Sequence, residues 1–414
     1  MPRMKFFPEM TTRHARLATA ATTASLIIIA FFTLGPGDPG EPLVPVTCVR
    51  CGSVWLTDLT ANVVLFIPFG VAATLSRLRP WWVMLIGFAV SLGVETWQFL
   101  GVAGRDATLA DVLANTLGSL LGALGAPSLR AAVNPAPARA HALVVASALL
   151  IVATAVAVSY LLGPTRPTAP LYLQIEPDNE GSRPAPTRVS AVTLNGTRVV
   201  GVGRLPKSLD VRGALQRKRF ILETRIHDAP VGRGLTVLVR VTPPLVAAVA
   251  EVGVSPDEWY GGTGLRGEDF GLRGLRMSVP RERNGSDSVL LSVERTGPLL
   301  QLRARTPKGG SSRMLELSVL DLWVPFMPFR TTVGERPLPM SVALAFVVPA
   351  ILGWWAGLAR NHVDFGIVIG ALGVAATCPI LTAGLAAPPA WAWILAITSI
   401  LAGWHAGRQR RQRD

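Results

Sequence analysis

Residues 94–122, VETWQFLGVAGRDATLADVLANTLGSLLG, are mostly apolar but carry six charged or amide side chains: Glu95, Gln98, Arg105, Asp106, Asp111 and Asn115. A helix that faces lipid gains nothing from such side chains, because ionisable groups are costly inside a membrane. They are tolerated where they face the interior of a helix bundle or a watery cavity. The stretch therefore predicts helices that pack inside a bundle and are joined by a short polar connection.

The composition of the whole chain indicates a membrane protein. Of its 414 residues, 50% are hydrophobic and only 16% are charged, whereas a soluble globular chain carries roughly a quarter charged residues. The apolar residues crowd into 17–163 and 340–405 and leave a middle region of ordinary polarity. We therefore predict a multi-pass α-helical membrane protein with an inserted soluble domain.

A helix needs about 20 mostly apolar residues to cross a membrane. Eight segments meet this requirement: Leu17–Leu34, Trp55–Leu75, Trp81–Leu100, Leu109–Ala126, Ala142–Leu162, Met340–Leu358, Phe365–Ala386 and Pro389–Trp404. Basic residues precede the first segment, as in a signal peptide. No small-residue cleavage site follows it, so we interpret it as an uncleaved anchor.

The distribution of positive charge predicts the orientation, because Lys and Arg are retained on the cytoplasmic side. With the N-terminus inside, thirteen of these residues fall in cytoplasmic segments and only two, Arg50 and Arg105, in short outer loops. We therefore expect a bacterial cytoplasmic (inner) membrane protein with both termini inside and residues 164–339 outside. We interpret the basic tail GRQRRQRD as an orientation signal and a contact with the lipid surface. With no nucleic-acid motif present, we expect no nucleic-acid partner.

The sequence predicts three domains: a membrane domain of five helices (1–163), an extracytoplasmic domain (164–339) and a C-terminal membrane block of three helices with a basic tail (340–414). The middle domain contains short runs of β-branched and apolar residues such as FILETRI and LTVLVRV. Its two Asn-Gly pairs, in LNGTR and RNGSD, suit tight hairpins. Many short strands with Gly- and Pro-rich turns predict an all-β jelly roll or sandwich.

The most unusual stretch of the middle domain is SPDEWYGGTGLRGEDFG, residues 255–271. Its aromatic pair, Trp259 and Tyr260, could stack on a sugar ring. Its acidic residues, Asp257, Glu258, Glu268 and Asp269, could hold calcium through their oxygens. We favour a plainer interpretation, a long loop with one aromatic pair tucked against the sandwich, because loop composition is weak evidence for a site.

Helical spacing places the polar residues of the membrane domain on shared faces. Glu95 and Gln98 are three residues apart and Asp111 and Asn115 are four apart, so each pair lies on one side of its helix. The segment DLTAN (58–62) resembles DVLAN (111–115), and both predicted helices run from outside to inside. We expect one binding site near the outer boundary, formed by Asp58, Asn62, Glu95, Gln98, Arg105, Asp106, Asp111 and Asn115.

Four further residues are expected to shape this bundle. Pro68 and Gly70 predict a bend in the second span, and Gly118 and Gly122 allow another helix to approach closely. The alternative to a binding site is an internal hydrogen-bond network between helices, in which Arg105 neutralises one carboxylate.

The same residues carry a resemblance to a known family. NVVLFIPFG followed by ETWQFLGVAGRDATLADVLANTLGSLLG resembles the VanZ-like family, over about residues 20–160. That family is named for a membrane protein associated with reduced susceptibility to the glycopeptide teicoplanin, and its biochemical activity is poorly defined. The positions that match its pattern are Asn62, Pro68, Gly70, Glu95, Gln98, Arg105, Asp106, Asp111, Asn115 and Gly118. By its architecture, the outer domain is similar to the concanavalin/LamG-like domains that accompany some VanZ-like proteins.

Cys48 and Cys51, in TCVRCGS, form a CxxC pair in the first outer loop. Such a pair can be half of a zinc site or a redox couple, but the only other cysteine, Cys378, lies in the seventh span. We favour a local disulfide or two idle thiols in an oxidising compartment, and we expect no metal and no cofactor.

Three functions compete. In the first, the polar site binds the head group of a membrane lipid or a lipid-linked cell-wall component, and the outer domain contacts envelope glycan. In the second, several carboxylates near one boundary form a hydrolase or transferase acting on a lipid-linked substrate. In the third, buried carboxylates and the break at Pro68 and Gly70 serve a proton-coupled transporter. We rank binding first, because no nucleophile motif is present, no repeat covers both membrane blocks and the charges lie away from the midplane.

Overall fold

The computed structural model describes residues 12–35, 45–50, 52, 54–101, 107–165, 170–175, 189–206, 209–216, 219–227, 236–243, 248–281, 288–321, 323–326, 338–359 and 363–413. Arg105, Asp106 and Cys51 lie outside these ranges. The chain divides into two compact units, Met1–Asn134 and Pro135–Asp414. Each unit is considered by itself below.

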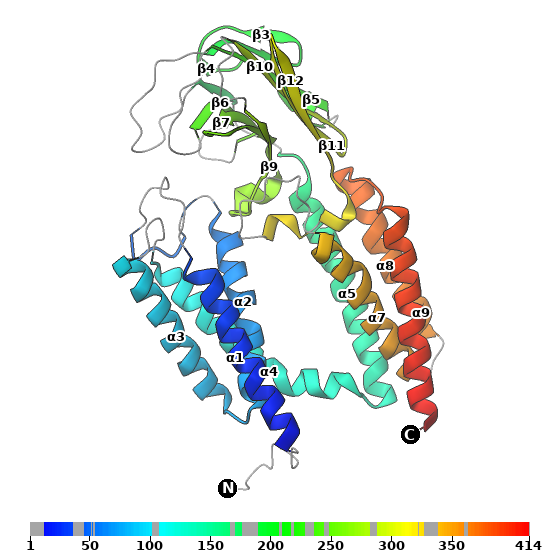
Figure 1. Ribbon diagram of the computed structural model, residues 1–414. Coiled ribbons are helices and arrows are strands. Elements are labelled where there is room, and N and C mark those ends of the chain that lie inside the picture. Colours follow the sequence, from blue (N-terminus) through cyan, green and yellow to red (C-terminus); the bar gives the residue numbers. More distant parts are fainter. Residues whose placement is uncertain are drawn as a thin grey trace. The chain divides into compact units, whose positions relative to one another are not determined.

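The described residues of the first unit form four helices: α1 (Thr12–Thr33), α2 (Trp55–Leu75), α3 (Pro80–Gly101) and α4 (Leu109–Val133). The helix α2 continues through Pro68. Its buried Phe66 and Phe69 pack with Ile29 of α1, Val83 of α3 and Ala123 of α4 in one apolar core. The four helices therefore share one interior (Figure 1).

The second unit contains four further long helices: α5 (Pro137–Leu162), α7 (Leu338–Leu358), α8 (Val363–Ala383) and α9 (Ala390–Arg413). Val144 of α5 packs in one core with residues of α7, α8 and α9, so α5 belongs to this unit by packing. The predicted boundary at residue 163 divides the chain by sequence pattern and stays a prediction. The helix α9 continues through the basic tail, where Arg411 donates a hydrogen bond to the carbonyl of Ala359.

Among the described residues, eight helices are long and apolar enough to cross a membrane, as the sequence predicted. Their outward faces carry exposed large apolar side chains such as Phe31, Leu150 and Leu381. Side chains of this kind are suited to lipid, which cannot hydrogen-bond to polar groups. The chain is a multi-pass membrane protein.

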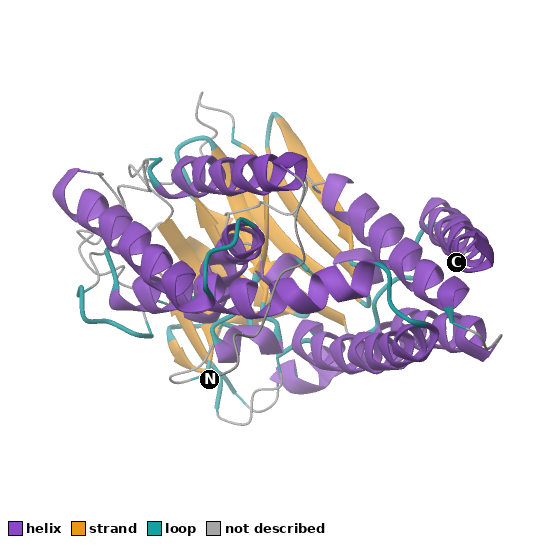
Figure 2. Ribbon diagram, turned by 90° about the horizontal axis from the view of Figure 1, so that it is seen from below, coloured by secondary structure: helices purple, strands orange, loops and turns teal. Residues whose placement is uncertain are grey.

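The inserted domain between α5 and α7 is a sandwich of two six-stranded antiparallel sheets, with strand orders β4-β1-β6-β7-β8-β9 and β12-β11-β10-β5-β2-β3. Figure 2 colours these strands orange and the helices purple. The strand bounds are β1 Tyr172–Ile175, β2 Val189–Leu194, β3 Thr197–Val199, β4 Gly203–Arg204, β5 Arg219–Ile226, β6 Thr236–Thr242, β7 Ala250–Val254, β8 Glu258–Thr263, β9 Leu275–Pro280, β10 Val289–Thr296, β11 Leu299–Thr306 and β12 Gly309–Glu316. Short helical turns are α6 Val211–Gln216, η2 Arg266–Phe270, η3 Val319–Asp321 and η4 Val324–Phe326. The inner faces of both sheets supply one apolar core, as the alternating patterns predicted.

The first Asn-Gly pair forms the hairpin that its sequence predicts. Asn195 and Gly196 have φ angles of 50° and 82° between the paired strands β2 and β3. Positive φ at both central residues is the geometry that Asn-Gly adopts at low cost. The second pair, Asn284-Gly285, lies outside the described residues.

The expectation of a long loop over residues 255–271 was wrong. Its centre is the strand β8, paired on one side with β7 and on the other with β9, and η2 follows. Trp259 and Tyr260 are buried in the domain, so their rings are not open for a sugar to stack on. The strand was missed because a glycine-rich composition is typical of a loop. Here the glycine is required by packing, since a Cβ atom at Gly261 would collide with Val293 and Leu302 of the facing sheet.

Arg295, on β10, has an unusual environment for a charged side chain. It lies on the same face of β10 as Val289, Leu291 and Val293, which face the core, and only 1% of its surface is exposed. Its Nε donates a long hydrogen bond of 3.5 Å to the Gly297 carbonyl, but Nη1 and Nη2 have no partner among the described residues. Burial, and then repulsion from Arg266, lower the pKa of Arg295 to about 10.

We predict that Arg295→Met stabilises the β domain. An unpaired buried charge is so costly that an apolar side chain of similar size removes more desolvation cost than it loses in contacts, by about 1–4 kcal/mol. Scanning calorimetry of the purified protein measures the expected rise in Tm. Arg305→Met, at an exposed position on the neighbouring strand β11, is the matched control and should change stability by less than about 0.5 kcal/mol. A fall in Tm for Arg295→Met would contradict the prediction.

Candidate functional site

Polar side chains of the first unit meet where α1 and α3 end and α2 and α4 begin. The chain reverses direction at each connection, so the last turns of α1 and α3 share an end with the first turns of α2 and α4. Asn62 lies in the second turn of α2, Glu95 and Gln98 near the end of α3, and Asp111 in the first turn of α4. We call Asn62, Glu95, Thr108, Asp111 and Asn115 the polar cluster.

Asp111 is the most connected member of the polar cluster. Its Oδ1 accepts a hydrogen bond from the side-chain amide of Asn62, and its Oδ2 accepts one of 2.8 Å from the hydroxyl of Thr108. Thr108 is the N-cap of α4, and its hydroxyl accepts a hydrogen bond from the Asp111 backbone N–H at 3.2 Å. The carboxylate thus lies at the positive end of the α4 dipole and joins α4 to α2.

Glu95 joins α3 to the same point. Its Oε2 accepts a hydrogen bond of 2.9 Å from the Thr108 backbone N–H, and the residue is only 7% exposed. One turn away, the buried Gln98 donates a hydrogen bond of 2.7 Å to the carbonyl of Thr33 at the end of α1. Two carboxylates, Glu95 and Asp111, are therefore held on either side of one threonine.

Asn115 lies one turn further along α4 and is almost completely buried. Its amide donates a hydrogen bond of 2.9 Å to the hydroxyl of Ser91 on α3. Its carbonyl oxygen Oδ1 has no hydrogen-bond partner among the described residues. A buried, unsatisfied acceptor inside an apolar bundle costs roughly 1–3 kcal/mol, so it marks a place that an external donor would occupy favourably.

Glycines bring α4 against α2 below the polar cluster. A Cβ atom added to Gly118 would lie 2.3 Å from the carbonyl oxygen of Val63, and one added to Gly122 would lie 2.3 Å from that of Ile67. On the α2 side, a Cβ atom added to Gly70 would lie 2.2 Å from the carbonyl oxygen of Ser119. The two helices are therefore in backbone contact, which no residue larger than glycine allows at these positions.

The remaining predicted site residues are placed less completely. Asp58 lies in the first turn of α2, is half-buried and takes part in interactions of its own. Arg105 and Asp106 are outside the described residues, so their place in the site stays a prediction. Glu95 and Asp111 make further interactions besides the hydrogen bonds above. The predicted bend at Pro68 and Gly70 also stays a prediction.

Sequence reasoning missed Thr108, Ser91 and Thr33. A signal existed for Thr108, because TLAD before an apolar run is an N-terminal capping pattern. A signal also existed for Ser91, which lies four residues before Glu95 and so on the same face of α3. The carbonyl of Thr33 carries no sequence signal, since every residue has one.

Cys48 is disulfide-bonded. Cys51, with which the sequence predicts a local pair, lies outside the described residues. Cys378 is a free thiol in α8. Among the described residues, no three His, Cys, Asp or Glu side chains come together in a way that would hold a metal ion. This includes the four acidic residues of the stretch 255–271.

Comparison with protein families identifies part of the chain. Residues 5–130 match the family model described as VanZ/LLP1, which is 126 of the 414 residues. This segment contains α1, α2, α3 and all but the last three residues of α4, and therefore the polar cluster and the glycine contact. Neither the curated proteins nor the solved structures contain a match to the chain. The likeness of the β domain to concanavalin/LamG-like domains therefore stays a prediction.

We predict that Gly122→Leu destabilises the first unit strongly, because the new side chain must push the backbones of α2 and α4 apart. Gly125→Leu is the matched control on the same helix, since a Cβ atom there meets nothing within 4 Å. Both changes gain similar helix propensity. Size-exclusion chromatography after heating, with fluorescence detection, should show a lower melting temperature for Gly122→Leu alone. Equal melting temperatures would contradict the close α2–α4 contact.

Proposed function

We propose that the polar cluster binds the polar head of a membrane lipid or of a lipid-linked component of the cell envelope. The observation that carries this proposal is the acceptor set of the cluster. It consists of the buried Glu95 carboxylate, the half-buried Asp111 carboxylate and the unpartnered, buried Asn115 carbonyl, all on helices that are apolar enough to cross a membrane.

The chemistry of the cluster favours a head group that donates hydrogen bonds. Carboxylate and amide oxygens accept hydrogen bonds from sugar hydroxyls or an ammonium group, and hydrogen bonds to charged acceptors are about twice as strong as neutral ones. The proposal also gives a role to Arg105, which precedes α4 in the sequence and whose guanidinium would pair with a lipid phosphate.

The hydrogen bonds of Asp111 favour binding over catalysis. Both of its oxygens are already held, by Asn62 and by Thr108, so this carboxylate is fixed instead of presented to a reacting atom. A held carboxylate is suited to orienting a head group, because its geometry costs no reorganisation when the ligand arrives. We accordingly place the hydrolase or transferase and the proton-coupled transporter second and third.

We extend the proposal to location and to antibiotic susceptibility. In it, the protein lies in the cytoplasmic membrane of a bacterium, the β domain is outside, and the cluster opens to the outer leaflet. Sequestering a lipid-linked cell-wall component there would change susceptibility to glycopeptides. The support is the match of residues 5–130 to the VanZ/LLP1 model and the charge asymmetry of the predicted loops.

The binding proposal predicts a co-purifying lipid whose occupancy depends on Glu95. Glu95→Gln keeps an oxygen that can accept the hydrogen bond from Thr108 but removes the charge. The loss of a charged hydrogen bond should lower occupancy at least tenfold. Native mass spectrometry of the protein released from detergent measures the adduct. Glu223→Gln, the same change on β5 of the sandwich, is the control and should keep the adduct.

An adduct of equal occupancy in wild type and Glu95→Gln, or no adduct in either, would contradict binding at the cluster. Conversion of the bound lipid to a product of different mass, lost in Glu95→Gln, would instead support the enzyme.

The orientation is predicted to expose the β domain outside the cytoplasm. In a chain without its native cysteines, Thr306→Cys on the β11–β12 turn should react with a membrane-impermeant maleimide on intact cells. Gln409→Cys in the C-terminal part of α9 should react only after permeabilisation. The reverse pattern would contradict the predicted topology.

A further inference from the structure

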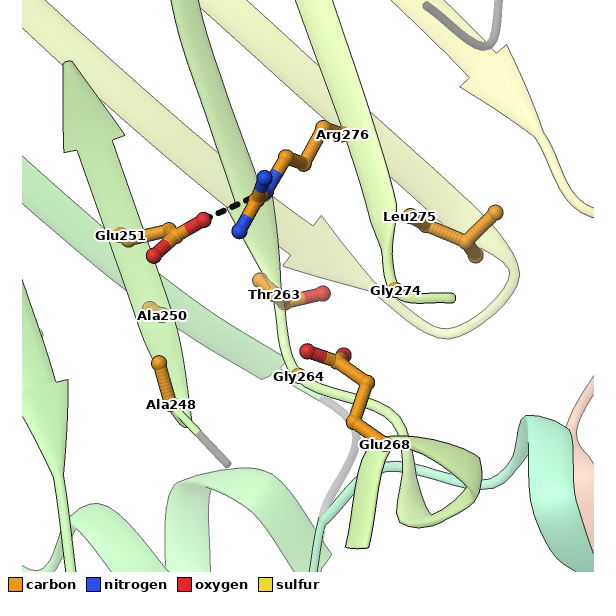
Figure 3. Close-up of a pocket in the computed structure, with 10 residues that line it drawn as sticks. Ala248, Ala250, Glu251, Thr263, Gly264, Glu268, Gly274, Leu275 and Arg276 are labelled. Atoms are coloured by element: carbon orange, nitrogen blue, oxygen red, sulfur yellow. Dashed lines mark ion pairs between the residues drawn. The ribbon is translucent and has the colours of Figure 1, made fainter. Parts of the chain in front are cut away.

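A cavity in the β domain lies beside the first residues of β7 and β9 and the last residue of β8 (Figure 3). It encloses about 210 Å³ of empty space, including the part that opens to solvent. Its polar walls are Glu251, Thr263, Glu268 and Arg276, and its other walls are small or apolar, among them Ala248, Ala250 and Leu275. Most of this space is open to solvent, and the enclosed part has room for about one water-sized group. One oxygen of a larger group can therefore enter it, while the rest of that group stays in solvent.

One wall of the cavity is an ion-pair network set by strand register. Arg240, Glu251, Gly262 and Arg276 are paired in a row across β6, β7, β8 and β9. Because Gly262 has no side chain, Arg276 reaches across β8, and its Nε lies 2.6 Å from Glu251 Oε1. On the other side, Arg240 Nη2 lies 3.2 Å from Glu251 Oε2. Both oxygens of Glu251 are thus engaged by arginines.

The groups that remain unengaged are mainly hydrogen-bond donors. No acceptor among the described residues is hydrogen-bonded to the two Nη groups of Arg276, which is about half exposed. Thr263 is 97% buried, since only 3% of its surface is exposed, and its hydroxyl has no partner among the described residues. Figure 3 shows the carboxyl group of Glu268 rising from η2 toward Thr263, with the Arg276 guanidinium above them.

Glu268 adds a donor instead of a negative charge at neutral pH. Burial, opposed by the hydrogen bond from the Leu265 backbone N–H, raises the pKa of Glu268 to about 8. The charged groups that face it are Glu251 and Asp269, which raise its pKa, and Arg276, which lowers it. Below pH 8 its carboxyl group is therefore protonated. With Arg276 positive and Glu251 negative, the lining then carries no net charge, and Arg240, which pairs with Glu251 from outside the lining, adds one positive charge nearby.

We propose that this cavity binds a compact oxyanion, the phosphate or carboxylate group of an envelope component, through Arg276, Thr263 and Glu268. Arg276 supplies its free Nη groups, a geometry that suits carboxylate and phosphate. Thr263 and protonated Glu268 each donate one further hydrogen bond. The cavity is separate from the polar cluster, so the result of testing one proposal does not decide the other.

The pH dependence follows from the sign of the Glu268 charge. When Glu268 ionises it repels the bound anion and loses its donor, so binding is present below pH 8 and is lost above it. At pH 9.5, which is 1.5 units above a pKa of about 8, the apparent affinity should fall about 30-fold. Glu268→Gln does not titrate and still donates, so its binding should be equal at pH 6.5 and 9.5.

The test is thermal unfolding of the full-length protein in detergent at constant ionic strength, titrated with sulfate and with acetate. The charge of each probe does not change between pH 6.5 and 9.5. Sulfate stands in for a phosphate group and acetate for a carboxylate group. A ligand that binds only the folded state raises Tm in proportion to its occupancy. We expect one or both probes to raise Tm at pH 6.5 in wild type and Glu268→Gln.

The matched variants decide the outcome. Arg276→Gln should abolish the rise in Tm, whereas Arg303→Gln, the same charge change on β11 of the other sheet, should keep it. Thr263→Val preserves the shape of the side chain but removes its hydroxyl, so it should reduce the rise in Tm. This variant provides the test if Arg276→Gln does not fold. The proposal is overturned if neither probe raises Tm, if Arg276→Gln responds like wild type, or if binding strengthens above pH 8. It is also overturned if calcium or methyl glucoside raises Tm in place of the anions.

Discussion

The backbone contact between α2 and α4 is the interaction on which the membrane site depends. Helices in lipid gain no hydrophobic free energy by associating, so they associate through close packing and hydrogen bonds. Gly70, Gly118 and Gly122 supply the close packing. The separation that they set is short enough for the Asn62 amide to reach Asp111. Without the glycines, the two carboxylates of the polar cluster would have fewer partners in an apolar bundle.

The second unit uses the same device in a different place. Gly353 and Gly357 of α7 face Gly403 and Gly407 of α9, and a Cβ atom at any of the four would lie within 2.4 Å of a carbonyl oxygen across the interface. These helices carry no polar cluster like that of the first unit in the part of the chain described. Close glycine packing therefore holds both units together. On the long helices of the second unit, the buried carboxylate of Asp364 lies on α8 and is paired with His141 of α5, whereas the two carboxylates of the polar cluster lie beside the glycine contact of the first unit. A hydrogen-bonded site therefore needs polar side chains close to the helix contact in addition to the glycines that form the contact.

The features that were predicted from the sequence depend on the composition of one segment. The features that were missed depend on contacts between segments that are distant in the sequence. The eight helices, the β sandwich and the Asn195-Gly196 turn follow from apolar length, alternation and positive φ, which are properties of single segments. The strand β8 was missed, because its glycines are explained only by Val293 and Leu302 of the opposite sheet. The cavity at Glu268 was missed for the same reason, since it needs the register that aligns Arg240, Glu251 and Arg276. Thr108 was within reach of sequence reasoning, through its capping pattern.

The most direct test of the central claim is cross-linking of Asn62→Cys to Asp111→Cys in membranes, in a chain without its native cysteines and with a short bis-methanethiosulfonate reagent. Their native side chains share a hydrogen bond, so the two thiols should be linked efficiently when the glycines are intact. The linkage should be lost when Gly122→Leu is added and kept when Gly125→Leu is added. Failure to link in the parent, or equal linkage in both glycine variants, would contradict the claim that the α2–α4 contact assembles the polar cluster.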